Sequence, residues 1–209
     1  MLEKLDRAVS MWKSRRRCSK ARQIAQSESQ PLKLHVGCGQ VHFPGWLHLD
    51  SNEKLPHLDV LWFADDGLPC PDRSCEYIYN EHFLEHLTIE QGKRFLQECR
   101  RVLLPGGVLR VAMPDMTECV RQYWEKDWDR QPWLEKYGYT WIKTGCEMLN
   151  IAFREWDHKW LYDREELRRR LSEAGFGTIV NVDWNCSQHA ELQNRETRPE
   201  TLLICEASP

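Results

Sequence analysis

The sequence predicts an α/β fold: a three-layer sandwich built on a mostly parallel, seven-stranded sheet, with a helical insertion after the fifth strand. Three observations predict it. Short apolar runs alternate with patterns of helical spacing, turn residues separate them, and residues 116–158 are too long for a simple connection. The 209-residue chain is long enough for one such core but not for two, so we expect an appendage at residues 1–31 and a single domain at 32–209.

The appendage is expected to be a basic amphipathic helix. Leu2, Leu5, Val9 and Trp12 recur at helical spacing. The first 33 residues hold nine Lys or Arg against three Asp or Glu, centred on residues 15–17. Such a charge run is usually a solvated helix face. The alternative is contact with an anionic partner, such as a membrane surface or a phosphorylated substrate.

The first three strands each end in residues suited to ligand binding. We expect these strands at 32–36, 46–49 and 59–63, where short apolar runs are bounded by turn residues. The carboxyl ends of parallel strands gather at one edge of the sheet, where this architecture binds its ligands. The residues that close the three strands are Gly37-Cys38-Gly39, Asp50 and Ala64-Asp65-Asp66.

The remaining elements continue the alternation. A fourth strand at 77–79 leads into Asn80-Glu81-His82. Thr88, with Gln91 three positions on, predicts a capped helix that residues 105–107 stop. The other expected elements are a strand at 108–113 leading to Asp115, a helix that begins at Asp163 and ends at Gly175, and closing strands at 178–184 and 201–206.

Tryptophans are concentrated in the predicted insertion at 116–158. Six of the ten tryptophans fall between Trp124 and Trp160. Most of these rings are expected to pack the insertion onto the sheet. The functional alternative is an aromatic-lined cap over the strand ends, which would select the substrate and exclude water.

Composition narrows the class of protein. A net charge of −3 argues against a general nucleic-acid binder, and no basic stripe with interleaved aromatics follows the appendage. The sequence has no signal peptide and no apolar run of the roughly 20 residues that span a membrane, so we expect a cytoplasmic protein. The nine cysteines are dispersed without a CxxC motif, which predicts reduced thiols and no metal site built from them.

The glycine pair and two aspartates predict a nucleoside site. Gly37 and Gly39, directly after a buried strand, let the backbone turn sharply and approach a ligand. Val41 stands where a dinucleotide fingerprint has its third glycine, which counts against a nicotinamide or flavin enzyme. Asp50 is placed to accept hydrogen bonds from ribose hydroxyls, and Asp65 from an adenine amino group.

Several motifs in order resemble a known family. The motifs are His35-Val-Gly-Cys-Gly39, Pro44-Gly-Trp-Leu-His-Leu-Asp50, Ala64-Asp65 through Leu68-Pro69, His82-Phe-Leu-Glu-His86, Leu104-Pro-Gly-Gly107, Met113-Pro-Asp115, and His158-Lys-Trp-Leu-Tyr162 with Ala174-Gly-Phe176. Over about residues 32–206 they look like class I S-adenosylmethionine-dependent methyltransferases, closest to the small bacterial type 11 branch. The resemblance implies a Rossmann-like methyltransferase domain with residues 116–158 as its substrate cap.

The resemblance also implies roles for particular residues. Gly37 and Gly39 would lie against the methionine part of S-adenosyl-L-methionine, and Asp50 would hold its ribose. The product would be S-adenosyl-L-homocysteine, and the acceptor a small molecule such as a sugar or natural-product intermediate. Val41 and the early Pro44 depart from the commonest pattern and put the loop contacts in question. The expected cofactor-binding residues are His35, Gly37, Cys38, Gly39, Asp50, Ser51, Ala64, Asp65, Asp66, Leu68, Asn80, Glu81 and His82.

Three residues are candidates for the general base that a hydroxyl acceptor requires. His82 and Asp115 follow strands four and five, and His158 closes the insertion. A purely structural role is the alternative for each of them. An amine acceptor that arrives unprotonated would need no base.

Two other functions compete with methyl transfer. His82-Phe-Leu-Glu85-His86 matches the HxxEH signature of a zinc metalloprotease, although it begins directly after a strand and lacks an assigned third ligand. We therefore expect no metal. The second is a catalytically silent protein of the same fold that binds the cofactor or a partner chain, because fold does not establish activity.

Overall fold

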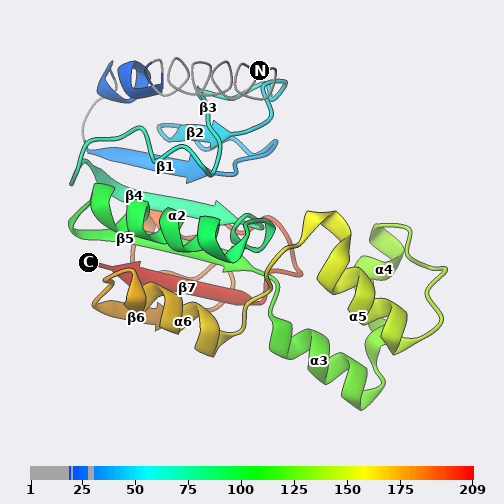
Figure 1. Ribbon diagram of the computed structural model, residues 1–209. Helices are drawn as coiled ribbons and strands as arrows, with labels where there is room; N and C mark the ends of the chain where they lie inside the picture. Colours follow the sequence, from blue (N-terminus) through cyan, green and yellow to red (C-terminus); the bar gives the residue numbers. More distant parts are fainter. Residues whose placement is uncertain (1–18, 20, 28–30) are drawn as a thin grey trace, which may run out of the picture.

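The structure, a computed structural model, describes residues 19, 21–27 and 31–209. The described part is built on a seven-stranded sheet of order β3-β2-β1-β4-β5-β7-β6 (Figure 1). Pairs from β3 to β5 are parallel, and β7 runs antiparallel to β5 and β6, so the expected mostly parallel sheet is confirmed. The strands are β1 (Leu32–Val36), β2 (Leu47–Asp50), β3 (Val60–Leu61), β4 (Cys75–Glu81), β5 (Leu103–Met113), β6 (Thr178–Asn181) and β7 (Leu203–Ser208).

Helices α2 (Ile89–Val102) and α6 (Arg164–Glu173) lie over one face of the sheet (Figure 1). The predicted capping box of Thr88 and Gln91 opens α2, and the Asp163 side chain caps α6. Both helices bury an apolar stripe in the main core. Among the described residues, no helix is both long enough and apolar enough to span a membrane.

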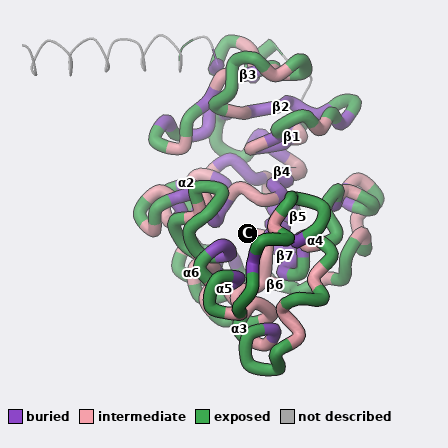
Figure 2. Tube along the Cα trace, turned by 90° about the vertical axis from the view of Figure 1, so that its right-hand side faces the viewer, coloured by how far each residue is buried: buried purple, intermediate pink, exposed green. Residues whose placement is uncertain are grey.

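Strand residues alternate between two different packing environments. Leu34 of β1 and Ile78 of β4 belong to the main core under α2 and α6. Their neighbours His35 and Tyr79 point to the opposite face, where their rings lie 5.3 Å apart. Figure 2 shows burial concentrated along the strands. The second face is covered by an aromatic cluster of Phe43, Trp46, Tyr79, Val108 and Leu192.

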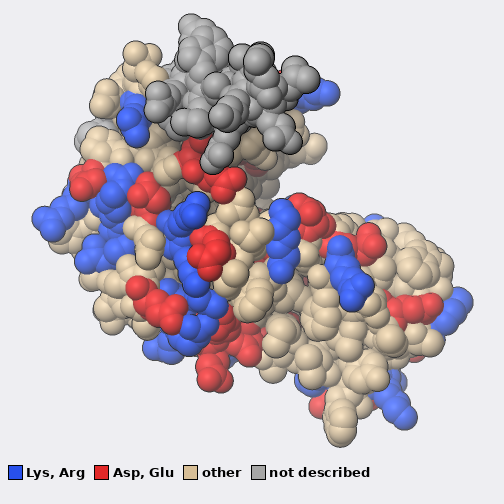
Figure 3. Space-filling view, viewed as in Figure 1, with Lys and Arg blue, Asp and Glu red and all other residues tan. Residues whose placement is uncertain are grey.

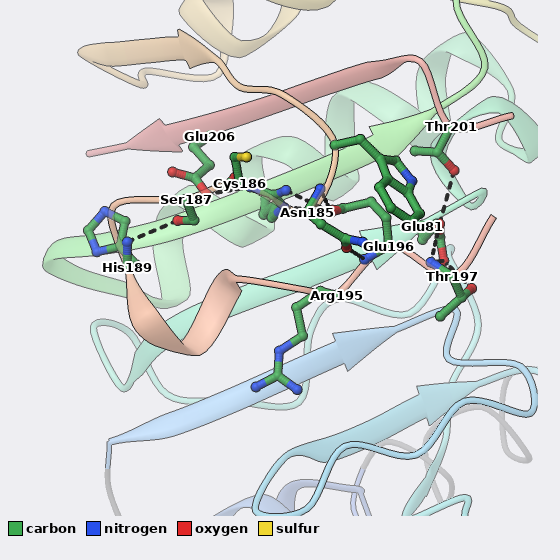
Figure 4. A network of polar contacts seen from close by, with 12 residues as sticks. Glu81, Asn185, Cys186, Ser187, His189, Arg195, Glu196, Thr197, Thr201 and Glu206 are labelled. Carbon is green, nitrogen blue, oxygen red and sulfur yellow. Dashed lines mark hydrogen bonds and ion pairs between the residues drawn. The ribbon is translucent and has the colours of Figure 1, made fainter. Parts of the chain in front are cut away.

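A buried arginine fixes the segment 182–202 on this second face. The Arg110 side chain on β5 is completely buried. It donates from Nε and Nη2 to both carboxylate oxygens of Glu196, at 2.7 and 2.8 Å. Nη1 donates to Glu206 on β7 at 2.6 Å and to the Cys186 carbonyl at 2.8 Å. The segment around Glu196 is therefore bound to the centre of the sheet (Figure 4).

Some predicted boundaries were wrong. Residues 105–107 do not stop α2, because the helix ends at Val102 and β5 begins at once, with Gly106 at a φ of +81°. The predicted third strand at 59–63 shortens to the two residues of β3, and the last strand shifts from 201–206 to β7. Pairing with neighbouring strands, which the local sequence does not encode, sets these limits.

The expected N-terminal helix falls largely outside the described residues, including Leu2, Leu5, Val9 and Trp12. Residues 21–27 are helical, and Ala21 and Ala25 are buried in the main core. This part of the predicted appendage therefore packs against the domain.

The predicted insertion is helical and projects beyond the carboxyl ends of the parallel strands (Figure 1). It has a small core of its own around Leu134 and Met148, against which Trp128 and Trp133 pack. Trp124, by contrast, is 82% exposed, so the tryptophans do not share one role. The insertion contains α3 (Met116–Glu125), η2 (Trp128–Arg130), α4 (Pro132–Lys136), α5 (Gly145–Arg154) and η3 (Glu155–Asp157).

We predict that Arg110→Met lowers the free energy of unfolding by about 3–5 kcal/mol, because it leaves two buried carboxylates without their cation. Arg121→Met is the matched control, since Arg121 forms its ion pairs on the exposed surface of α3 and its loss should change the free energy of unfolding far less. Urea unfolding of both variants measures the difference. Equal losses would contradict the anchoring role of Arg110.

Candidate functional site

A cavity of about 760 Å³ opens where β1, β2 and β4 end. Several parts of the chain meet there: the glycine loop after β1, the end of β2, the segments after β3 and β4, and the segments 157–159 and 197–198. The lining residues are His35, Gly37, Cys38, Gly39, Gln40, Val41, Asp50, Ser51, Asn52, Leu55, Trp62, Ala64, Glu81, His82, Phe83, His86, Leu87, Gln91, Asp157, Lys159, Thr197 and Arg198.

The glycine loop is held in shape by Asp50. One Asp50 carboxylate oxygen accepts from the Gly39 amide at 3.0 Å, and the other accepts from the Asn52 amide at 2.9 Å. Gly37 and Gly39 both have positive φ, at +67° and +51°. A Cβ at Gly37 would lie 2.6 Å from the Phe83 ring, whereas the space beside Gly39 is open. Asp50 therefore retains acceptor capacity at a loop whose backbone a ligand can approach.

Four predicted cofactor residues do not line this cavity. Asp65 accepts a hydrogen bond from Gln91 Nε2 at 3.0 Å and lines a separate hollow of about 240 Å³. Asp66 and Leu68 are buried, Leu68 in the main core. Asn80 is fully buried, and its amide has no hydrogen-bond partner among the described residues. The structure therefore brings together nine of the thirteen predicted cofactor residues: His35, Gly37, Cys38, Gly39, Asp50, Ser51, Ala64, Glu81 and His82.

A chain of hydrogen bonds fixes the proton of His82. Glu81 accepts from the Thr201 hydroxyl at 2.9 Å, so that hydroxyl has no second proton to give. His82 Nε2, 2.9 Å from the same oxygen, must then be the donor. Burial lowers the pKa of His82 to about 3, so the ring is neutral and its Nδ1 carries a lone pair. That lone pair faces Glu85 Oε1 at 3.5 Å, and both nitrogens of His82 are directed at protein groups.

The other two base candidates lie outside the cavity lining. Asp115 caps α3 by accepting from the Thr117 amide at 2.8 Å. His158 donates from Nδ1 to the Ala152 carbonyl at 2.7 Å, and its ring lies 5.0 Å from His86. Of the three candidates, the structure places only His82 at the cavity.

Sequence reasoning missed the contribution of segment 197–201. Its amides and hydroxyls bind Glu81: the Thr197 amide donates at 2.9 Å and the Thr197 hydroxyl at 2.6 Å (Figure 4), and the Arg198 amide donates at 3.2 Å. Arg198 then lines the cavity together with Lys159. No local pattern marked either residue, because each reaches the site through contacts between distant parts of the chain.

The HxxEH motif does not form the helix that a metalloprotease uses. His82 has a left-handed backbone, with φ of +49°, and η1 (Leu84–His86) is a single short turn. Because His82 lies outside η1 and its backbone is left-handed, the two histidines do not form an i, i+4 pair on one α-helical face. The geometry expected of the zinc-protease alternative is absent from this segment.

Comparisons with known proteins agree with this fold. Residues 51–111 match a family model described as a methyltransferase domain. A crystal structure of an S-adenosylmethionine-dependent methyltransferase from Archaeoglobus fulgidus superposes with a TM-score of 0.54 at 16% identity, covering 97% of this chain and 94% of that one. Another from Thermotoga maritima gives 0.52 at 17% identity, covering 97% and 96%. The expected Rossmann-like fold is confirmed.

Two curated relatives match parts of the chain. Phosphoethanolamine N-methyltransferase of Plasmodium falciparum is 25% identical over 146 residues, which are 60% of this chain and 54% of that protein. A protein described as a probable S-adenosylmethionine-dependent methyltransferase of Mycolicibacterium smegmatis is 37% identical over 62 residues, 30% of this chain and 23% of its own length. The chain thus spans about half of one relative and a quarter of the other, and the resemblance inferred from the motifs is confirmed.

We predict that Gly37→Ala destabilises the protein more than Gly39→Ala. Both substitutions place alanine in the left-handed region, at a cost of roughly 1–2 kcal/mol. Only Gly37→Ala also displaces the Phe83 ring. Thermal unfolding compares the two variants, and a Gly39 variant of equal or lower stability would contradict the packing of Phe83 on the loop.

Proposed function

We propose that this chain, with its class I S-adenosylmethionine-dependent methyltransferase fold and central type 11 segment, transfers a methyl group from S-adenosyl-L-methionine to a small-molecule acceptor. One observation carries the proposal: the glycine loop and Asp50 meet at the strand ends, at a 760 Å³ cavity. The open space beside Gly39 and the remaining acceptor capacity of Asp50 fit an adenosyl ligand. S-adenosyl-L-homocysteine is the product.

In this proposal the cavity residues divide between the two halves of the cofactor. Gly37, Cys38 and Gly39 bind the methionine part, and Asp50 with Ser51 binds the ribose. His35 lies beneath the loop, stacked on Phe43 with ring centroids 4.5 Å apart. Further roles stay predictions: Ala64 near the adenine, Glu81 and His82 near the methionine end, and Asp65 acting on the site through Gln91.

Methyl transfer from a sulfonium needs little acid or base catalysis. When bound, S-adenosyl-L-methionine supplies a methyl group on a sulfonium whose leaving group is neutral. The chain's part is to align the acceptor and exclude water, which is worth on the order of 7–11 kcal/mol. Burial, with the charge of Asp50 second, raises the pKa of Cys38 to about 12. The thiol beside the cofactor therefore stays protonated and does not compete with the acceptor as a nucleophile.

The contacts of the three base candidates favour positioning roles over taking a proton from an acceptor. Both nitrogens of His82 face protein groups, and neither His158 nor Asp115 lines the cavity. We propose that His82 orients the cavity wall and that Asp115 and His158 act in the insertion's structure.

Two cationic side chains support an acceptor that carries an anionic group. Arg198 and Lys159 both line the cavity. Lys159 is paired with Asp157 at 3.1 Å, whereas Arg198 has no side-chain hydrogen bond or ion pair with the described residues. A phosphorylated or carboxylated amine, sugar or natural-product intermediate fits this wall. The relative whose printed name includes phosphoethanolamine supports the same class.

Other sequence expectations remain proposals. Residues 32–209 form the methyltransferase domain with 116–158 as its cap, and residues 1–31 the basic appendage. On the face shown in Figure 3, acidic and basic side chains are intermixed, which supports a small molecule rather than a nucleic acid. A cytoplasmic location completes the proposal, and contact of the basic appendage with an anionic surface stays the alternative to a solvated helix face.

We predict that calorimetric titration with S-adenosyl-L-homocysteine shows one binding site. Asp50→Asn should weaken the affinity for this ligand about 10- to 150-fold. The loss corresponds to one charge-assisted hydrogen bond of roughly 1.5–3 kcal/mol. Asp72→Asn is the control, because Asp72 is an exposed carboxylate outside the cavity lining, and the affinity of this variant should stay close to that of wild type. Unchanged binding by Asp50→Asn would refute the ribose assignment.

We predict that the protein methylates phosphorylated acceptors in preference to their neutral counterparts. The assay measures formation of S-adenosyl-L-homocysteine with phosphoethanolamine against ethanolamine, and with sugar phosphates against free sugars. Arg198→Gln should raise KM for the phosphorylated member of a pair and leave the neutral one unaffected. Cofactor binding without transfer to any acceptor would instead support a catalytically silent protein.

A further inference from the structure

Three metal-binding side chains converge at the junction between β4 and the insertion. Glu85 and His86 belong to η1, and His158 follows η3, more than seventy positions along the chain. One ligand atom from each lies within 4.8 Å of the other two. The backbone already joins these segments, because Lys159 and Trp160 donate their amides to the Glu85 carbonyl at 2.8 and 3.2 Å.

The Glu85 carboxyl group needs a partner that the described residues do not supply. Its side chain is completely buried, and neither oxygen has a hydrogen-bond partner among them. The nearest polar group, His82 Nδ1 at 3.5 Å, presents a lone pair because Nε2 carries the ring proton. A buried carboxyl group in this state either takes up a proton, in line with burial raising the pKa of Glu85 to about 8, or is paired with a cation or a metal.

His158 is oriented as histidine ligands of metals usually are, and His86 lies beside it. His158 donates Nδ1–H to the Ala152 carbonyl at 2.7 Å, which leaves the lone pair on Nε2. The ring of His86 lies against that of His158, with ring centroids 5.0 Å apart. A second-shell carbonyl that fixes the tautomer of a histidine is the common arrangement around protein-bound metals.

We propose that Glu85, His86 and His158 bind one divalent transition-metal ion of the Zn²⁺ class. Two imidazoles and one carboxylate form an established three-ligand set for Zn²⁺, whereas Ca²⁺ and Mg²⁺ require oxygen ligands. Binding draws the side chains together, since the ligand atoms of tetrahedral Zn²⁺ lie about 3.4 Å apart. These three ligands differ from those of the HxxEH metalloprotease motif, because His82 is not one of them.

Such an ion would fasten the insertion to the sheet. It would compensate the charge of Glu85 and join η1, at the end of β4, to the segment that closes the insertion. His86 also lines the large cavity, so the ion lies at its edge. The proposal does not rest on methyl transfer, and binding of S-adenosyl-L-homocysteine is not needed to test it.

The test measures metal content and affinity of the full chain after chelation and reloading with Zn²⁺ or Co²⁺. The expected result is one ion per chain and a Co²⁺ spectrum without thiolate charge-transfer bands. Glu85→Gln, His86→Gln and His158→Gln should each weaken binding at least about tenfold. His189→Gln is the control, because His189 lies outside the cluster and contacts Tyr77 instead. This variant should bind the metal ion as wild type does.

Thermal unfolding gives a second reading that does not depend on the affinity measurement. At the same Zn²⁺ concentration, the Tm of the wild type should rise clearly more than that of Glu85→Gln. In the metal-free state the Tm of Glu85→Gln should be no lower than that of wild type, because the substitution removes a buried carboxylate without a partner. Absence of stoichiometric binding, thiolate bands that vanish in Cys146→Ser or Cys186→Ser, or equal binding by the three ligand variants would overturn the proposal.

Discussion

The pairing of Arg110 with two buried carboxylates is the interaction on which the candidate site most depends. A guanidinium in the middle of a sheet is tolerated only when its donors are satisfied, and here Glu196 and Glu206 satisfy them. Glu196 in turn accepts from the Asn185 amide at 2.9 Å. The irregular segment 182–202 thereby acquires one fixed path across the second face.

Glu81 holds the same segment at the edge of the sheet. It accepts from the amides of Thr197 and Arg198 and from the hydroxyl of Thr201. These bonds bring Arg198 to the cavity and determine the proton on His82. One wall of the site is thus built from a loop that two buried acidic groups hold in place, and the opposite wall from the glycine loop held by Asp50.

The sequence predicted the features that local interactions determine. The caps at Thr88 and Asp163 and the sharp turn at Gly37 and Gly39 are encoded by short-range patterns, and the structure contains them. Contacts over long separations were not predictable. Thr197 contacts Glu81 across 116 positions of the sequence. His158 lies close to Glu85 and His86 only because the folded insertion brings the chain back to them. The sequence motif assigned Asp65 to the cavity. In the structure its carboxylate is turned to Gln91, a contact that the motif does not encode.

A crystal structure of the protein with S-adenosyl-L-homocysteine tests the central claim most directly. Our account predicts the adenosyl group in the 760 Å³ cavity, with its ribose hydroxyls on the Asp50 carboxylate and its amino-acid part along Gly37 to Gly39. A ligand in another part of the molecule, or an adenosyl group in this cavity without contact to Asp50, would contradict it.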